Sequence, residues 1–261
     1  MKHIFSILLF LTTITLYSQV IQEFKGKALL TDQFGYYYEI RDNEIKKYVN
    51  TGALYYTYSN NVLGVISNVD VTNPYKVVVY FNDFTKIVIL DNMLSPASDV
   101  VDLTTINQDE TSLVCRSYND AFWYYNFIQF KLTRVNHLLE ETNNSGNIAT
   151  LLGKNIQPNF MVEYNNKVYL NDPKHGILVF DIYGTYLKTI PIYGLEQFQV
   201  KEKYILYVNN SSQIERYDFF TLEKEVYEPE KYQDIQLVRI ENKLIYAVDK
   251  NHRLIIDKIE K

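Results

Sequence analysis

The segment from Lys167 to Ile190, KVYLNDPKHGILVFDIYGTYLKTI, carries a complete series of short β-strand signals. Three runs rich in β-branched and aromatic residues are separated by Asn, Asp, Pro and Gly, which favour turns. Just upstream, a similar run from Phe160 to Tyr164 joins the first of these through Asn165-Asn166, a pair that tolerates a two-residue hairpin turn. We predict four antiparallel strands, A to D, in a sheet that must stack on other sheets to bury its two faces.

The same pattern recurs along the whole chain when the aromatic residue of each predicted strand B is used as an anchor. The spacings between successive anchors are 42, 43, 46, 38 and 39 residues. The six anchors are Tyr38, Tyr80, Trp123, Tyr169, Tyr207 and Tyr246. Each is followed three or four positions later by Asp or Asn, and then by another β-rich run. A repeat of about 40 residues with four short strands is typical of propeller blades. The sequence therefore predicts an all-β fold, a six-bladed β-propeller of four-stranded antiparallel blades.

The two ends of the repeat region complement each other. The sixth unit ends at Lys261 after its strand C, whereas Val20 to Phe24 form an alternating strand that belongs to no unit. A propeller closes when a strand from one end of the chain completes the blade at the other end, so that no open sheet edge remains. We predict that Val20 to Phe24 supplies strand D of the last blade.

The first 18 residues have the pattern of a secretory signal peptide. Lys2 precedes an apolar run from Ile4 to Leu16, and Ser18 offers a small residue at the cut site. The alternative, a membrane anchor, requires roughly 20 apolar residues. No Cys lies near the cut site for lipid attachment. We predict a signal peptide at 1–18 and a single propeller domain at 19–261, soluble in the periplasm or outside the cell.

Charge and cysteine content narrow the partners further. The net charge is −5, and loss of Lys2 makes it more negative. This argues against nucleic acid and anionic membranes as partners. No later stretch is long and apolar enough for a transmembrane segment, and we expect a monomer. The only cysteine, Cys115, lies in a strand-like run, so we interpret it as a small buried hydrophobe and expect no disulfide.

Candidate site residues come from the turns after strand B, which should lie on the same face of a propeller as the connections between blades. These turns carry Asp42, Asp83, Asn126, Asp172, Asn210 and Asp249. We predict that they surround the axial opening, with His175 beside Asp172. The four carboxylates offer oxygen ligands to Ca²⁺, the only cofactor we consider. The alternative is that these residues serve their own turns. No nucleophile elbow, phosphate-binding loop, dinucleotide fingerprint or zinc-binding spacing is present, so we assign no catalytic residue.

Two connections between predicted blades are longer than the repeat requires, and each is a second candidate for a functional region. They span 104–110 and 144–159, and long loops in compact domains often have functions. In the second loop we predict a helical turn at 148–152 with Asn147 as its N-cap. The alternative is a packed surface insertion. Adjacent aromatic residues at 36–38, 55–56 and 122–125 fit the core, and any that are exposed would suit contact with protein or carbohydrate.

The unit VYLND followed by Gly176 to Ile190, GILVFDIYGTYLKTI, resembles blades of NHL-type six-bladed propellers. In the other units the Gly of the turn between strands C and D is absent or displaced. The resemblance implies the fold, but this fold hosts scaffolds, sugar binders, lyases and hydrolases. Enzymes among such propellers usually place His and acidic metal ligands at the axial opening, and this chain has the acids but few suitably placed histidines.

Two hypotheses for function follow. The first is a non-enzymatic protein-interaction or scaffold module of the bacterial cell envelope, which binds an envelope or secreted protein through the loop around Asn144 to Pro158. The second is a propeller that binds a small ligand or carbohydrate, or a Ca²⁺-dependent enzyme, with Asp42, Asp83, Asp172 and Asp249 at the opening. Convergence of these four carboxylates would favour the second hypothesis.

Overall fold

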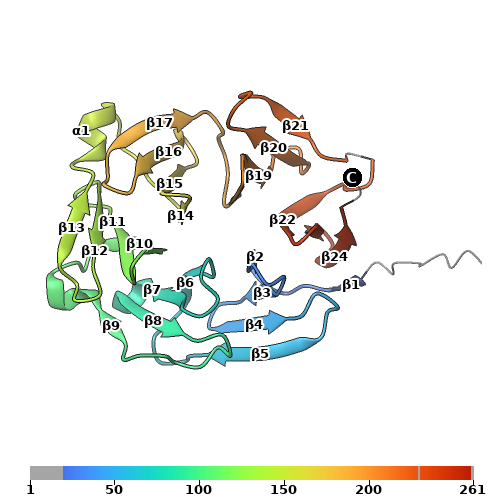
Figure 1. Ribbon diagram of the computed structural model, residues 1–261, viewed down its shortest axis with the longest axis horizontal. Helices are drawn as coiled ribbons and strands as arrows, with labels where there is room; N and C mark the ends of the chain where they lie inside the picture. The colour runs from blue at the N-terminus through green and yellow to red at the C-terminus, as the bar shows by residue number, and fades with distance from the viewer. Residues whose placement is uncertain (1–19, 229, 260–261) are drawn as a thin grey trace, which may run out of the picture.

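The chain folds into six four-stranded antiparallel sheets arranged in a ring, which confirms the predicted β-propeller (Figure 1). The structure is a computed structural model that describes residues 20–228 and 230–259. The sheets follow one another around the ring in chain order, and the first strand of each blade lies nearest the axis.

Five blades are built from consecutive strands. Blade 1 contains β2 (Ala28–Thr31), β3 (Tyr37–Ile40), β4 (Glu44–Tyr48) and β5 (Leu54–Ser59). Blade 2 contains β6 (Ile66–Asp70), β7 (Val77–Phe81), β8 (Lys86–Leu90) and β9 (Val101–Asp102). Blade 3 contains β10 (Thr111–Ser117), β11 (Ala121–Asn126), β12 (Lys131–Val135) and β13 (Glu141–Asn144). Blade 4 contains β14 (Phe160–Tyr164), β15 (Lys167–Asp172), β16 (Gly176–Asp181) and β17 (Tyr186–Ile190). Blade 5 contains β18 (Gln199–Lys201), β19 (Tyr204–Val208), β20 (Ile214–Asp218) and β21 (Lys224–Val226).

Blade 6 joins the two ends of the described chain. Its strands are β22 (Ile235–Glu241), β23 (Leu244–Asp249), β24 (Arg253–Lys258) and β1 (Val20–Glu23). β1 pairs antiparallel with β24, with Val20 opposite Ile256. The amide of Phe24 then donates a hydrogen bond of 2.8 Å to the His252 carbonyl, and the Phe24 ring is 1% exposed. The predicted closure by the N-terminal strand is confirmed.

The six aromatic anchors all lie in the second strand of their blade, as predicted. None of them is more than 4% exposed. Each packs into one of the apolar clusters that fill the spaces between neighbouring sheets. Because large buried aromatic side chains contribute several kcal/mol each, this position largely determines the repeat that is visible in the sequence.

Tight hairpins join the first two strands of several blades. In blade 4, Asn165 and Asn166 have φ angles of 47° and 58°, the left-handed conformation that asparagine tolerates. Asn119 with Asp120 and Asn242 with Lys243 repeat this conformation in blades 3 and 6. The predicted two-residue hairpin turn is confirmed.

The innermost strands are held to one another by polar side chains. Each innermost strand turns one edge toward the axis, where its backbone groups have no neighbouring strand. The Gln199 side chain in blade 5 makes the hydrogen bonds that a neighbouring strand would make. Its amide group donates to the Ile240 carbonyl at 3.0 Å, and its oxygen accepts from the Ile240 amide at 2.8 Å. Asp70 in blade 2 accepts from the Arg116 amide in blade 3 at 2.9 Å. These bonds satisfy the strand edges and connect the blades around the axis.

The two faces of the ring have different turns. We name the BC face for the turns between the second and third strands, and the AB face for the turns between the first and second strands. On the BC face the Phe127 amide donates to the Glu110 carbonyl at 3.1 Å, and the Ile235 amide donates to the Ser212 carbonyl at 2.9 Å. In both bonds a turn after strand B meets a connection between blades, so the two lie on the same face as predicted.

The two long connections are partly helical. The first contains the short 3₁₀ helix η2 (Leu103–Ile106), and a second 3₁₀ helix, η1 (Asn82–Phe84), lies in the turn between β7 and β8. The other connection contains α1 (Ile148–Leu152), where the Asn147 side chain accepts a hydrogen bond from the Thr150 amide at 2.7 Å. The predicted helical turn and its N-cap are confirmed. Ile148 and Ile156 are buried in the core, so much of this loop is a packed part of the fold.

The repeat pattern predicts the third strand of blade 3 at Gln129 to Val135 and the first strand of blade 5 at Glu196 to Lys201, and both predicted starts were wrong. The third strand of blade 3 begins at Lys131, two residues after the predicted Gln129, because Phe130 has a left-handed φ of 51° and belongs to the turn. The first strand of blade 5 begins at Gln199, three residues after the predicted Glu196. Leu195 and Phe198 are instead buried in the connection that precedes it.

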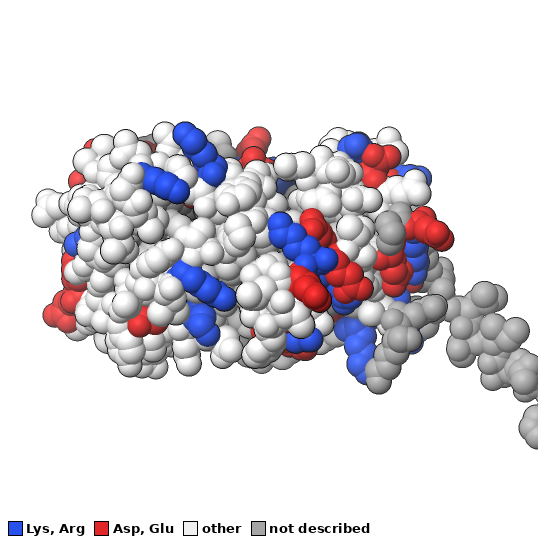
Figure 2. Space-filling view, turned by 90° about the horizontal axis from the view of Figure 1, so that it is seen from above, with Lys and Arg blue, Asp and Glu red and all other residues white. Residues whose placement is uncertain are grey.

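Other predictions concern the ends and the surface of the chain. The predicted signal peptide at 1–18 lies outside the described residues. Across the part of the chain that the structure describes, no helix is long and apolar enough to cross a membrane. Cys115 is fully buried, as predicted. Figure 2 shows basic and acidic side chains close together on one side of the ring.

Candidate functional site

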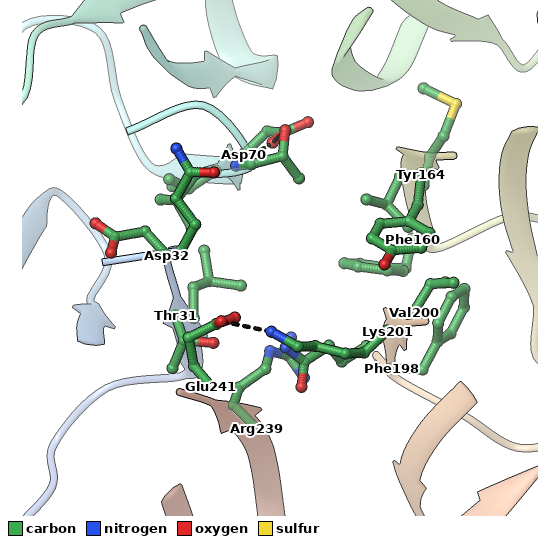
Figure 3. Close-up of a pocket in the computed structure, with 18 residues that line it drawn as sticks. Thr31, Asp32, Asp70, Phe160, Tyr164, Phe198, Val200, Lys201, Arg239 and Glu241 are labelled. Atoms are coloured by element: carbon green, nitrogen blue, oxygen red, sulfur yellow. Dashed lines mark hydrogen bonds and ion pairs between the residues drawn. The ribbon is translucent and has the colours of Figure 1, made fainter. Parts of the chain in front are cut away.

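The innermost strands enclose a cavity of about 330 Å³ that opens toward the AB face. Its wall comes from blades 1, 2, 4, 5 and 6, mostly from the last residues of the innermost strands. Figure 3 shows charged residues on one side of this cavity and aromatic residues on the other. We name it the axial cavity. Its volume is at the lower end of the range for sites that bind small organic molecules.

The aromatic side of the axial cavity is formed by blades 4 and 5. Phe160 and Phe198 make an edge-to-face pair with ring centroids 5.0 Å apart, and Tyr164, at the other end of β14 from Phe160, also lines the cavity. Phe198 is 1% exposed, whereas Phe160 is only partly buried. Edge-to-face packing fixes the positions of both rings, so this side presents a preformed apolar surface.

Two acidic residues of the charged side, Asp32 and Asp70, have structural partners. The Asp32 carboxylate accepts a hydrogen bond of 2.7 Å from the Tyr38 hydroxyl and lies 3.7 Å from the Lys47 ammonium. Burial and this carboxylate raise the pKa of Tyr38 well above its usual value, so the hydroxyl stays a donor. Asp70 accepts from the amide and hydroxyl of Thr72, in addition to the Arg116 amide described above. Both carboxylates therefore already have partners within the protein.

The third acidic residue, Glu241 at the end of β22, forms an ion pair with Lys201 across the boundary between blades 6 and 5 (Figure 3). The Glu241 side chain is 10% exposed and that of Lys201 is 31% exposed. This pair faces the cavity and its two charges compensate each other. It is the part of the charged side that solvent reaches most easily.

Arg239, two residues earlier on β22, is buried to 4% exposure without an acidic partner among the described residues. Its guanidinium donates to the Val238 carbonyl at 2.9 Å and to the Gln197 side-chain oxygen at 2.9 Å. Both acceptors are neutral. Burial lowers the pKa of Arg239 to about 10, so the group still carries its charge at neutral pH.

The turn residues predicted to surround the opening have local partners. Asn126 accepts from the amides of Ile128 and Gln129 in its own turn. Asp249 accepts from the amides of Asn251 and Arg253, also in its own turn. These are the bonds expected of residues that stabilise hairpin turns.

Asp172 is the most completely bonded of the predicted residues. It accepts from the amides of Lys174 and His175 in its own turn and from the Gln157 amide of the long connection. The His175 ring nitrogen Nδ1 lies 3.1 Å from the same Asp172 oxygen that accepts from Gln157, so the predicted proximity of His175 to Asp172 is confirmed. Burial would raise the pKa of this carboxyl, but the hydrogen bonds outweigh burial and hold the pKa below its usual value.

The remaining three predicted residues lie on the BC face in different settings. Asp42 is exposed and lies 3.7 Å from the Lys27 ammonium. Asp83 accepts from the Val65 amide at 3.3 Å. Asn210 contributes to a second hollow of about 410 Å³ between blades 5 and 6. Among the residues with described positions, no group of three or more His, Cys, Asp or Glu side chains is arranged to hold a metal ion. The calcium site stays a prediction.

A patch of aromatic side chains lies on the AB face of blades 1 and 2. Phe34 and Tyr75 pack edge to face at 5.6 Å, Tyr36 stacks on Tyr55 at 5.4 Å, and Tyr55 contacts Tyr56 at 4.2 Å. We name these five residues the aromatic patch. Phe34, Tyr55 and Tyr75 are 49%, 48% and 57% exposed. The buried Lys47 ammonium lies 4.5 Å from the centre of the Tyr36 ring, a cation–π contact that holds this ring in place.

Sequence reasoning missed the residues of the axial cavity. Asp70, Lys201 and Glu241 each end the innermost strand of their blade. A blade-by-blade alignment of these last residues would have shown a recurring polar position. Arg239 gave no such signal, because an arginine within a short strand is usually solvent-exposed.

Comparison with known proteins gives the fold and nothing finer. No model of a protein family matches the chain, and no curated protein is significantly similar to it. Many solved structures are similar. The β-propeller domain of Myceliophteria thermophila Cps50 (Swd1) gives a TM-score of 0.60 at 9% identity and covers 92% of this chain and 98% of that one. Streptogramin B lyase gives 0.58 at 11% identity, with 93% and 88% covered. The Pan2 WD40 domain of Neurospora crassa gives 0.55 at 8% identity, with 90% of each covered. These likenesses show the fold alone.

Proposed function

We propose that this protein is a non-enzymatic interaction module of the bacterial cell envelope that binds another exported protein through the aromatic patch. The observation that carries the proposal is the exposure of three large rings on the AB face of blades 1 and 2, Phe34, Tyr55 and Tyr75, each about half exposed. Large apolar side chains that gather exposed on one face of a domain are typical of interaction sites. Tyrosine is also enriched in such sites because it combines a large apolar ring with a hydroxyl.

The packing of the patch favours a binding role over loosely held surface residues. Tyr36 and Tyr56 are half-buried and fix the position of Tyr55 through ring contacts. The Phe34 and Tyr75 rings support each other across the boundary between blades 1 and 2. Rings that are already ordered lose little conformational entropy when a partner binds. The patch is therefore a preorganised surface.

The long loop at 144–158 is a weaker candidate for the same function. Ile148 and Ile156 are buried in the core between blades 3 and 4, and of the apolar residues of α1 only Leu151 is strongly exposed, at 55%. The sequence-based hypothesis that this loop is the binding surface stays a prediction. It is tested below in parallel with the patch.

The signal-peptide pattern at the N-terminus supports export, and the negative net charge supports a protein partner over nucleic acid. The absence of a catalytic motif in the sequence supports a non-enzymatic role. A monomer would leave the whole AB face free to bind.

The proposal is tested by affinity purification from envelope fractions with three matched variants. The first replaces Phe34, Tyr55 and Tyr75 by Ser. The second replaces Tyr183 and Tyr193, which are 63% and 54% exposed and lie outside the patch, by Ser. The third is Leu151→Ser.

We expect the patch variant to lose the captured protein by at least about tenfold, because aromatic anchors commonly contribute more than 1 kcal/mol each to binding. The Tyr183/Tyr193 variant should retain it. Loss in the Leu151→Ser variant alone would instead assign binding to the loop. Equal recovery with all variants would refute the proposal.

A further inference from the structure

Among the described residues, no acidic side chain lies within ion-pair distance of Arg239. The two lysines at the axial cavity each have a carboxylate partner. Lys201, in the wall, pairs with Glu241, and Lys47, behind the wall, lies 3.7 Å from Asp32. Arg239 is more deeply buried than Lys201, yet its acceptors are only a backbone carbonyl and a side-chain amide. Burial of a charge without an opposite charge costs several kcal/mol. An anion supplied from outside would remove this cost.

The position of Arg239 gives such an anion access. Arg239 lines the axial cavity and also the hollow between blades 5 and 6 on the BC face. The guanidinium has more N–H donors than its two hydrogen bonds use. It can therefore bind an oxyanion without losing its present partners. Thr31, which also lines the axial cavity, adds a buried hydroxyl oxygen that has no hydrogen-bond partner.

The other residues of the cavity restrict the ligand. The wall contains three carboxylates: Lys47 faces Asp32, Lys201 pairs with Glu241, and Asp70 accepts from neutral donors only. A ligand with a single negative charge matches the one positive charge of Arg239, whereas the nearby carboxylates repel the second charge of a dianion such as phosphate. Phe160 and Phe198, on the opposite side in Figure 3, offer an apolar surface for a flat body.

We propose that the axial cavity binds a small organic monoanion, with its carboxylate on Arg239 and a flat apolar body against Phe160 and Phe198. The guanidinium fork matches the geometry of a carboxylate. This site is separate from the aromatic patch, so its occupancy and the binding of a protein partner are independent findings.

The first experiment titrates the purified wild-type protein with phenylacetate, with the neutral isostere phenylacetamide and with inorganic phosphate. Binding is followed by isothermal calorimetry and by the NMR signal of the Arg239 side-chain Nε–H group. We expect phenylacetate to bind and to shift this signal, and phenylacetamide to bind at least about tenfold more weakly, because a charge-assisted hydrogen bond contributes about 1.5–3 kcal/mol. Binding of phosphate without phenylacetate, or no shift of the Arg239 signal, would overturn the proposal.

The second experiment uses Arg239→Met and a control, Arg116→Met. Arg116 also lacks an acidic partner within ion-pair distance among the described residues, but it lies outside the axial cavity, beside a hollow between blades 2 and 3. Arg239→Met should melt at the same temperature as the wild type or higher, since it removes a buried uncompensated charge, and should lose phenylacetate binding at least about tenfold. Arg116→Met should bind as the wild type does. Unchanged binding by Arg239→Met, or equal losses in both variants, would overturn the proposal; the wild-type titration decides if Arg239→Met fails to fold.

Discussion

Closure of the ring by β1 makes Phe24 one of the most sensitive positions in the chain, although it lies just beyond a short terminal strand. Its ring is 1% exposed and belongs to the apolar cluster that contains Tyr246, Leu254 and Ile256 of blade 6. Its amide donates to the His252 carbonyl at 2.8 Å. The change Phe24→Ala removes the ring and leaves the backbone pairing of β1 in place.

The expected magnitude follows from the burial of this ring. Replacement of a fully buried Phe by Ala lowers the free energy of unfolding by about 3–5 kcal/mol. For a domain of this size each kcal/mol lowers the melting temperature by about 2–4 °C. Phe24→Ala should therefore melt about 6–20 °C below the wild type.

The control is Ile21→Ala, three residues earlier and within β1. Ile21 is 56% exposed and pairs with Ile255 through its backbone. This variant should lose no more than about 0.5 kcal/mol. Both variants are compared with the wild type by thermal and urea unfolding, monitored by circular dichroism. If Phe24→Ala melts within about 2 °C of Ile21→Ala, β1 is not an integral strand of blade 6 and the reasoning is refuted.

Two further predictions concern the long connection between blades 3 and 4. Asp172 binds this connection through the Gln157 amide, and its folded pKa is below the ordinary 3.8, so its contribution to stability is present above that pH and is lost as the pH falls through the folded pKa. Asp172→Asn should lower the free energy of unfolding by about 1–3 kcal/mol at pH 7, and in urea unfolding the difference should shrink below pH 4; a difference that grows on acidification would contradict this assignment. Asn147→Ala removes the N-cap of α1 and should cost about 0.5–2 kcal/mol, whereas Asn143→Ala, in the adjacent strand β13, should cost less in the same assay; the reverse order would show that the cap is not stabilising.

The fold could be predicted from the sequence because its strongest signals are local. Each anchor aromatic lies in a short strand, and each following Asp or Asn lies in a turn, so the pattern survives without knowledge of distant contacts. The orphan strand at Val20 and the missing last strand could be matched because a ring cannot keep an open edge. Strand ends were less predictable: the left-handed φ of Phe130 depends on a turn that its residue type does not favour.

The axial cavity could not be predicted in the same way. Its wall combines the ends of strands that lie about one blade apart in the sequence, and the roles of these residues depend on contacts between blades. Arg239 resembles any surface arginine until the structure shows it buried against Gln197 of the preceding blade. Three of the five residues of the aromatic patch, Tyr36, Tyr55 and Tyr56, were visible as adjacent tyrosines, whereas Phe34 and Tyr75 were not. Strand alternation alone does not say which rings a neighbouring blade covers.

The most direct test of the proposed function is site-specific photocrosslinking in the intact envelope. A photoreactive phenylalanine analogue replaces Tyr75 in the aromatic patch or, as a control, Tyr183, which is similarly exposed in blade 4. The account predicts a discrete crosslinked adduct with one other protein from position 75 and none from position 183. Crosslinking from position 183 alone, or from neither position, would contradict it.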